Sequence, residues 1–309
     1  MAVIEATQVS KRYPRVTALD RLDLTVGDGV TGLVGANGAG KSTLIKILLG
    51  LLPLTGGQAK VFGHDVATEG ATIRALVGYM PEHECLPADV SANDFVVHMG
   101  EMSGLPHNAA RERAADVLRQ VGLAEERYRP MGGYSTGMKQ RAKLAQALVH
   151  DPRLVLLDEP TNGLDPRSRD DMLALVRKVG TEFGIAVLVT SHLLGELERV
   201  SDHVVVLDAG RLLRSSATTD YLHTTGTLVV EVLGGRRETE LIARALTGAG
   251  VAARIAGPVV EVEARDASTY DTVRDLTAEL RLGLVRMQER HHHIEDVFRD
   301  EEAGHVQPV

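Results

Sequence analysis

Residues 35–43 have the sequence GANGAGKST, and this string constrains the fold of the chain more than any other feature. It satisfies the pattern G-x-x-x-x-G-K-[ST]. Its glycines allow a tight turn whose amide groups point inward, at the N-terminus of the helix that follows. Lys41 supplies a positive charge for the β- and γ-phosphates, and the Ser42 hydroxyl is a ligand for Mg²⁺. The string therefore predicts a nucleotide-phosphate site between a strand and a helix.

The flanking sequence contains the strand and the helix that this motif requires. Val30–Val34 is an apolar strand that leads into the glycines, and Thr43–Leu52 has apolar residues at helical spacing before Pro53. We expect the loop to hold the nucleotide through Gly35, Asn37, Gly38, Ala39, Gly40, Lys41, Ser42 and Thr43.

A pair of acidic residues follows a second predicted strand. The apolar run 154–157 leads directly into Asp158 and Glu159. Asp158 is suited to orient Mg²⁺, and Glu159 to polarise an attacking water as a general base. A predicted helix at about 167–183 separates this strand from the next one at 185–190. Strand, helix and strand in this order predict a parallel α/β sheet.

The pattern along the chain predicts two domains. We expect a P-loop domain at 1–218, with a mixed or parallel sheet and a helical subdomain at about 84–150. A Ser-, Thr- and Gly-rich linker lies near 215–225. The order β-α-β-β-α-β follows at 226–300, which is typical of a ferredoxin-like α+β domain. We expect 301–309 to be a disordered tail.

The composition argues against a nucleic-acid partner. The formal net charge is −8, aromatic residues make up 3% of the chain, and there is no Trp. A phosphate-backbone binder needs a basic face, and a stacking platform needs aromatic side chains. The apolar runs are too short to cross a bilayer. The single cysteine, Cys85, suits a reducing compartment.

Three further motifs appear in a fixed order. YSTGMKQR occupies 134–141, LVLLDEPTNGLDP occupies 154–166, and TSH occupies 190–192. Together with GANGAGKST, residues 3–215 resemble the ATP-binding subunits of ABC transporters. The resemblance implies an ATPase that binds ATP and Mg²⁺.

The resemblance also implies a dimer. Ser135 and Gly137 precede a predicted helix at 138–149, so they present a hydroxyl and amide groups at its N-terminus. In the family, this end meets the γ-phosphate bound by a second copy, and Asp165 lies at the seam between the copies. The chain is therefore expected to form a nucleotide-sandwich dimer with itself.

Two further roles follow from the resemblance. His192 follows the predicted strand 185–190 and is expected to hold the γ-phosphate or the attacking water. Tyr13 matches the aromatic residue that stacks on adenine.

The sequence departs from the family pattern at two places. Glu82, in VGYMPEH, stands where the family has glutamine, and YSTGM stands where LSGGQ is usual. A carboxylate can still ligate Mg²⁺, although its charge beside the γ-phosphate opposes binding. Both variants, and IEDVF at 294–298, resemble a subgroup of single-domain ATPases that serve drug-, sodium- or polysaccharide-type exporters.

The leading hypothesis is therefore an ATPase subunit that drives a separate membrane permease at the inner face of the cell membrane. The segment 83–105 is expected to contact that permease. The alternative is a soluble ABC ATPase of DNA repair or translation, but the second cassette or long coiled coil usual there is absent from the sequence. A GTPase or small-molecule kinase would leave YSTGMKQR unexplained.

The histidine run 291–293 is not expected to bind a metal. Adjacent residues of a strand point to opposite faces, so three in a row do not converge on one ion.

Overall fold

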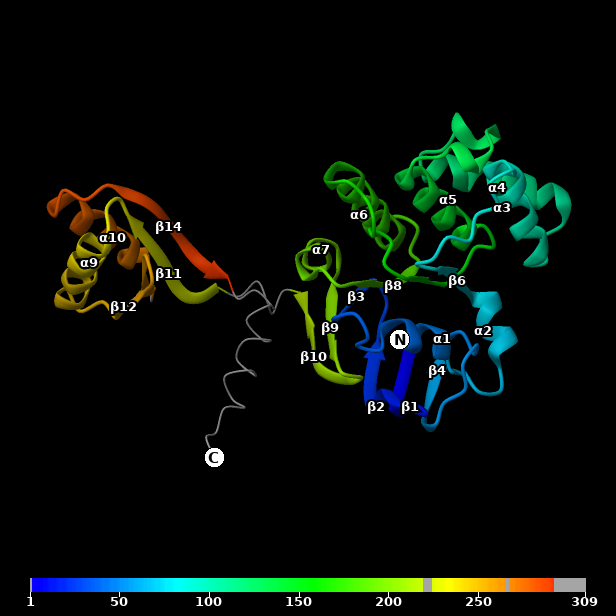
Figure 1. The fold of residues 1–309 in the computed structure, drawn as a ribbon, viewed down its shortest axis with the longest axis horizontal. Coiled ribbons are helices and arrows are strands. Elements are labelled where there is room, and N and C mark those ends of the chain that lie inside the picture. Colours follow the sequence, from blue (N-terminus) through cyan, green and yellow to red (C-terminus); the bar gives the residue numbers. More distant parts are fainter. Residues whose placement is uncertain (1, 219–223, 265–266, 292–309) are drawn as a thin grey trace. The chain divides into compact units, whose positions relative to one another are not determined.

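The computed structural model describes residues 2–218, 224–264 and 267–291. The chain divides into two compact units, Met1–Thr218 and Thr219–Val309 (Figure 1). Each unit has its own sheet structure and its own hydrophobic core.

A six-stranded sheet forms the centre of the first unit. In the spatial order β10-β9-β3-β8-β7-β6, its strands are Arg211–Ala217, His203–Asp208, Val30–Val34, Ala186–Ser191, Leu154–Leu157 and Val77–Met80. The five strands from β9 to β6 pair in parallel, and β10 pairs antiparallel with β9. This confirms the predicted α/β sheet. The carboxyl ends of β3, β7 and β8 lie at one edge, so the loops that follow them converge there.

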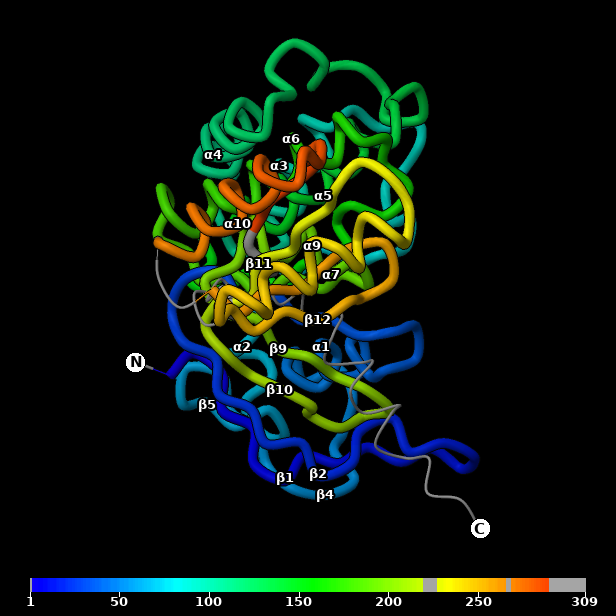
Figure 2. The backbone as a smooth tube through the Cα atoms, turned by 90° about the vertical axis from the view of Figure 1, so that its left-hand side faces the viewer, coloured from blue at the N-terminus to red at the C-terminus, as the bar shows by residue number. Residues whose placement is uncertain are grey.

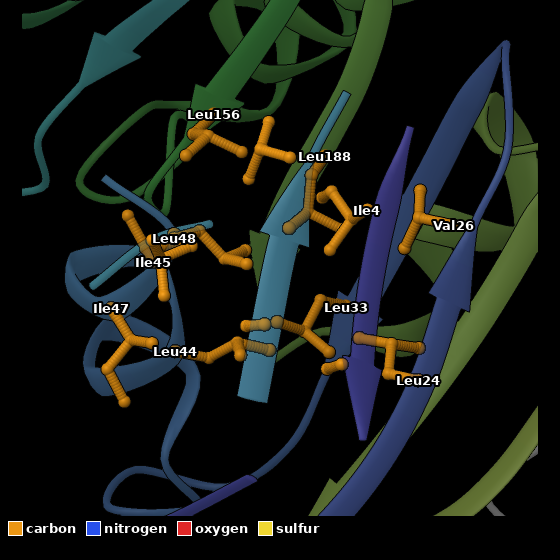
Figure 3. Packing of buried hydrophobic residues seen from close by; sticks show 14 of the residues in the cluster. Ile4, Leu24, Val26, Leu33, Leu44, Ile45, Ile47, Leu48, Leu156 and Leu188 are labelled. Carbon is orange, nitrogen blue, oxygen red and sulfur yellow. The ribbon is translucent and has the colours of Figure 1, made fainter. Parts of the chain in front are cut away.

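A second, antiparallel sheet shares a core with the first. Its strands, in the order β2-β1-β4-β5, are Val16–Val26, Ile4–Tyr13, Gly56–Val61 and His64–Asp65. The core joins both sheets to α1 (Lys41–Leu48), and Figure 3 labels Ile4, Leu24, Val26, Leu33, Leu44, Ile45, Ile47, Leu48, Leu156 and Leu188 in it. Burial of each large apolar side chain stabilises the fold by about 1.5–3 kcal/mol. The core therefore fixes α1 and the glycine loop before it.

The remaining helices of this unit are α2 (Gly70–Leu76), α3 (Ala92–Met102), α4 (His107–Gln120), α5 (Thr136–Leu148), α6 (Pro166–Thr181) and α7 (Leu194–Val200), with 3₁₀ turns at Glu126–Tyr128 and Met131–Gly133. Figures 1 and 2 both place α3, α4 and α5 at the end of the unit opposite β1, β2 and β4. These three helices fall within 84–150. The segment 83–91 is not helical. Helix α3 begins after Ser91, because the Ser91 hydroxyl caps the helix by accepting a hydrogen bond from the Asp94 amide at 3.1 Å.

The described part of the second unit is one sheet with two helices. Its elements are β11 (Thr224–Val232), α9 (Arg236–Gly248), β12 (Ala253–Ala256), β13 (Val259–Glu263), α10 (Ala267–Glu279) and β14 (Leu284–His291). The strands lie in the order β12-β13-β11-β14, and all neighbours are antiparallel. Alternate residues of β11 and β13, such as Leu228, Val230 and Val260, pack with Ile242 and Val273 of the helices.

Several sequence expectations fall outside the described residues or need a boundary correction. The motif at 294–298, the tail at 301–309 and the last two histidines of 291–293 lie outside the described residues. The range expected for the linker, 215–225, overlaps a strand at each end, because β10 pairs with β9 through Ala217 and β11 begins at Thr224.

Gly78 of β6 provides a test of the packing between β6 and α5. A Cβ atom at this position would lie 1.9 Å from the carbonyl oxygen of Ala147, so the strand and the helix would have to separate. We expect Gly78→Ala to lower the free energy of unfolding by about 1–3 kcal/mol, as overpacking usually does. Gly27→Ala is the control, because a Cβ atom added there would have no neighbour within 4 Å. Equal unfolding midpoints for both variants by circular dichroism would contradict this account.

Candidate active site

The glycine loop between β3 and α1 requires glycine at two positions, Gly35 and Gly40. A Cβ atom on Gly35 would lie 2.4 Å from the Leu207 carbonyl oxygen. Gly40 has a φ of 106°, and a Cβ there would lie 2.5 Å from the Ala18 carbonyl oxygen. Only glycine accommodates both the backbone conformation and these approaches. The loop can therefore keep its amide groups turned toward a bound anion.

A cavity of about 490 Å³ opens over this loop. It is lined by Ala18, Ala36, Asn37, Gly38, Ala39, Gly40, Lys41, Ser42, Thr43, Glu82, Glu159, Asn162 and His192. The cavity thus brings together most of the loop with three other predicted site residues from distant parts of the sequence.

Asp158 lies at the end of β7, beside the first turn of α1. Its Oδ1 accepts hydrogen bonds from Ser42 Oγ at 3.2 Å and from Thr190 Oγ1 at 2.9 Å. The Thr190 hydroxyl also accepts a hydrogen bond from the Glu159 amide at 2.9 Å, so β8 fixes both acidic residues. Burial raises the pKa of Asp158, although the bonds from Thr190 and Ser42 act in the opposite direction.

Glu159 is held between a lysine and a histidine. Its side chain is 7% exposed, with Oε1 at 3.3 Å from Lys41 Nζ and Oε2 at 2.8 Å from His192 Nδ1. Lys41 Nζ also donates to the Gly35 carbonyl oxygen at 2.7 Å. The backbone φ of Glu159 is 50°, a strained conformation for a residue with a side chain. Strain of this kind persists where surrounding contacts enforce it, as these contacts do here.

Glu82, the residue that replaces glutamine, enters the cavity from the end of β6. Its Oε1 accepts a hydrogen bond from Asn162 Nδ2 at 3.2 Å. Lys143 of α5, which is 3% exposed, donates to the Glu82 carbonyl oxygen at 2.9 Å. Burial lowers the pKa of Lys143, while Cys85, Glu84, Glu82 and Asp158 act in the opposite direction. Lys143 thus connects α5 to the backbone of Glu82.

Four predicted site residues lie away from this cavity. Ser135 caps α5 by accepting from the Met138 amide at 3.3 Å, and Asp165 caps α6 by accepting from the Ser168 amide at 3.0 Å. A Cβ on Gly137 would lie 3.4 Å from Ser168 Oγ, so the two helix N-termini are neighbours. Tyr13 is 44% exposed, and its ring lies 5.3 Å from Lys11 Nζ.

The residues at and beside the cavity suit Mg²⁺. Ser42, Glu82 and Asp158 offer hydroxyl and carboxylate oxygens, which are the ligands that this ion prefers. Within the described ranges, no group of three or more His, Cys, Asp or Glu side chains could hold a metal ion. Mg²⁺ usually keeps waters and binds through one or two carboxylates together with substrate phosphates, so a small protein ligand set fits it.

The sequence reasoning missed three residues around the cavity. Asn162 and Thr190 lie inside the motifs at 154–166 and 190–192, so position alone could have suggested them. Lys143 had no such signal, because its contact joins residues that are 61 positions apart.

Cys85 is exposed as a residue. Partial burial nevertheless raises the pKa of its thiol, which favours the unreactive form.

Comparisons with known proteins agree with this site. The sequence profile described as ABC transporter matches residues 19–162. The daunorubicin/doxorubicin resistance ATP-binding protein DrrA of Streptomyces peucetius is 38% identical over 230 residues, which cover 74% of this chain and 69% of that protein. The daunorubicin resistance ATP-binding protein DrrA2 of Streptomyces coeruleorubidus is 33% identical over 95% of this chain and 90% of that protein. A match of that extent has to include most of the second unit.

Solved structures agree on the fold. The structure of cbiO1 from Clostridium perfringens, described as part of the ABC transporter complex cbiONQ, has a TM-score of 0.65 and 25% identity over 71% of this chain and 90% of that one. A structure described as the ATP binding subunit of an ABC transporter has a TM-score of 0.62 and 28% identity, over 71% of this chain and 91% of that one.

The chain belongs to the ABC transporter family, as one of its ATP-binding proteins. Within that family it is an ATPase subunit, similar to relatives named for drug and antibiotic resistance and for bacitracin transport. None of the helices in the described ranges is long and apolar enough to span a membrane.

The raised pKa of Asp158 predicts a pH-dependent stability. Because burial raises this pKa above its ordinary value of 3.8, ionisation of Asp158 destabilises the folded state as pH rises through the raised value. Asp158→Asn removes the charge and keeps an oxygen acceptor. We expect it to raise the free energy of unfolding by about 1 kcal/mol near pH 7 and by less near pH 4.

Asp165→Asn is the matched control, with the opposite expected sign. The Ser168 side chain and amide lower the pKa of Asp165, so its ionised form stabilises the fold above that pKa. Denaturant unfolding of both variants at the two pH values measures the effects. If Asp158→Asn raised the free energy of unfolding more near pH 4 than near pH 7, the raised pKa of Asp158 would be contradicted.

Proposed function

We propose that this chain binds MgATP at the cavity over the glycine loop and hydrolyses it to drive a separate membrane permease that acts as an exporter. The observation that carries the proposal is the contact of Glu159 with both Lys41 and His192 at the wall of that cavity. The names of relatives such as the bacitracin transport ATP-binding protein BcrA of Bacillus licheniformis support the transport role.

In this proposal the residues at and beside the cavity have different tasks. The amides of the glycine loop and Lys41 bind the phosphates, and the positive end of α1 adds to their attraction. Ser42, Asp158 and Glu82 would hold Mg²⁺, which neutralises charge on the β- and γ-phosphates when bound. Glu159 accepts a proton from the attacking water. His192, hydrogen-bonded to Glu159, keeps that carboxylate oriented and would contact the γ-phosphate.

We further propose that two copies complete each site. Ser135 and Gly137 lie at the N-terminus of α5, which is a favourable place for a phosphate. They do not line the cavity of their own chain, so they are available to the nucleotide of a partner. Asp165 would lie at the seam because its helix N-terminus neighbours that of α5. Tyr13 would stack on the adenine.

We propose that α3 and the segment before it, within 83–105, contact the permease at the inner face of the cell membrane. Nucleic acid is not a proposed partner, because the net charge of −8 disfavours it.

We propose that the second unit is a ferredoxin-like module that supports dimer formation. The strand order β12-β13-β11-β14 and the element order β-α-β-β-α-β support that fold.

Replacing Glu159 by glutamine tests the catalytic role. Glu159→Gln keeps the shape of the side chain but removes the base, so we expect ATP hydrolysis to fall by about 10²- to 10⁴-fold. ATP binding persists, and the variant is expected to accumulate as an ATP-bound dimer in size-exclusion chromatography. Glu182→Gln, which changes an exposed carboxylate paired with Lys178, is the control. Turnover near that of the unmodified chain in Glu159→Gln would refute the assignment.

A further inference from the structure

Glu196 is a buried carboxylate that the proposed reaction does not use. It lies on α7, four positions after His192, and is 7% exposed. A carboxylate away from water is unfavourable unless other groups pair with it. Its partners therefore indicate what it holds in place.

Those partners come from three different segments. Glu196 Oε2 accepts hydrogen bonds from Thr161 Oγ1 at 2.7 Å and from Ser191 Oγ at 3.1 Å. Its Oε1 lies 3.0 Å from Arg169 Nε of α6. Thr161 and Ser191 are 5% and 2% exposed, so both hydroxyls are also out of water. One carboxylate thus joins the loop after β7, the end of β8 and the start of α6.

Two of these segments carry the Glu159–His192 pair. Thr161 follows Glu159 by two positions, and Ser191 directly precedes His192. The Ser191 hydroxyl also accepts a hydrogen bond from the Leu193 amide at 3.0 Å, so it holds the backbone on both sides of the histidine. The His192 side chain itself is 42% exposed, and packing alone leaves it room to move.

Arg169, the ion-pair partner of Glu196, also holds the loop that leads to Asp165. Arg169 Nη2 donates to the Leu164 carbonyl oxygen at 3.4 Å, while its Nε faces Glu196. The loop between Glu159 and Asp165 is therefore attached at both of its ends to groups that contact Glu196.

We propose that Glu196 is a positioning residue for hydrolysis. It fixes the loop after Glu159 against the segment that carries His192, so that Nδ1 of the histidine stays within hydrogen-bonding reach of the glutamate. The inference rests on the roles proposed above for Glu159 and His192. Small displacements of a reacting group can lower a rate on the order of 100-fold, which makes such a support measurable.

The test compares Glu196→Ala with the unmodified full chain in steady-state ATP hydrolysis. We expect kcat to fall on the order of 10- to 100-fold, and KM for ATP to change by less than about threefold, because the phosphate-binding groups stay in place. Glu182→Ala, at the far end of α6, is the matched control and is expected to leave both constants unchanged. An unchanged kcat in Glu196→Ala would overturn the inference.

A second variant and a spectroscopic measurement distinguish a loss of positioning from unfolding of the variant. Thr161→Val removes one hydroxyl at nearly constant volume, and we expect it to lower kcat in the same direction. The imidazole NMR signals of His192, assigned by their loss in His192→Ala, are expected to shift in Glu196→Ala and in Thr161→Val but not in Glu182→Ala. Unshifted signals in both variants would also overturn the inference.

The same experiment separates this inference from the proposed function. If His192→Ala itself hydrolyses ATP at the unmodified rate, the proposed role of His192 is wrong. If His192→Ala is impaired while Glu196→Ala and Thr161→Val retain full kcat, the proposed function stands and the positioning role of Glu196 is wrong.

Discussion

The buried ion pair between Lys41 and Glu159 is the interaction on which the rest of the site depends. Both side chains are nearly out of water, at 6% and 7% exposure, with Nζ and Oε1 separated by 3.3 Å. Either charge alone would be strongly unfavourable in this place, so each requires the other. The lysine follows β3 and the glutamate follows β7. Because the sheet is parallel, both strands have their carboxyl ends at the same edge. The sheet is therefore what permits the pair to form.

The strand between them, β8, supplies the groups that hold this pair in place. Thr190 bonds both to the Asp158 carboxylate and to the Glu159 amide, and His192 closes the far side of Glu159. From there the contacts continue through Asn162 to Glu82. The glycine loop, the acidic residues and the loop after β6 thus form one connected polar network.

The sequence predicted the parts of the fold that are encoded locally. Val30–Val34 and Leu154–Leu157 have the same bounds in the prediction and in the structure, because apolar runs bounded by motif residues mark short buried strands. The β-α-β-β-α-β order of the second unit was also predicted from local patterns. The composition and periodicity of 85–150 predicted a mostly helical part, but 83–91 at its start lacks apolar residues at helical spacing and is not a helix.

The residues that the sequence could not provide are those whose role depends on long-range contacts. Lys143 and Glu196 sit on helices among other charged residues, and nothing in the string distinguishes them from exposed ones. Their burial follows from the pairing of distant segments. The strained backbone of Glu159, with a φ of 50°, also depends on a distant contact, because its amide donates to the Thr190 hydroxyl of β8.

The central claim is that each chain carries two half-sites, one at the glycine loop and one at Ser135 and Gly137. Mixing two inactive variants tests it most directly. Lys41→Ala removes the first half-site and Ser135→Arg blocks the second, so a mixed dimer retains one intact site formed by the undamaged half of each copy. The account predicts that each variant alone is inactive and that an equimolar mixture recovers a measurable fraction of the ATPase rate. A mixture as inactive as its components, although mixed dimers form, would contradict it.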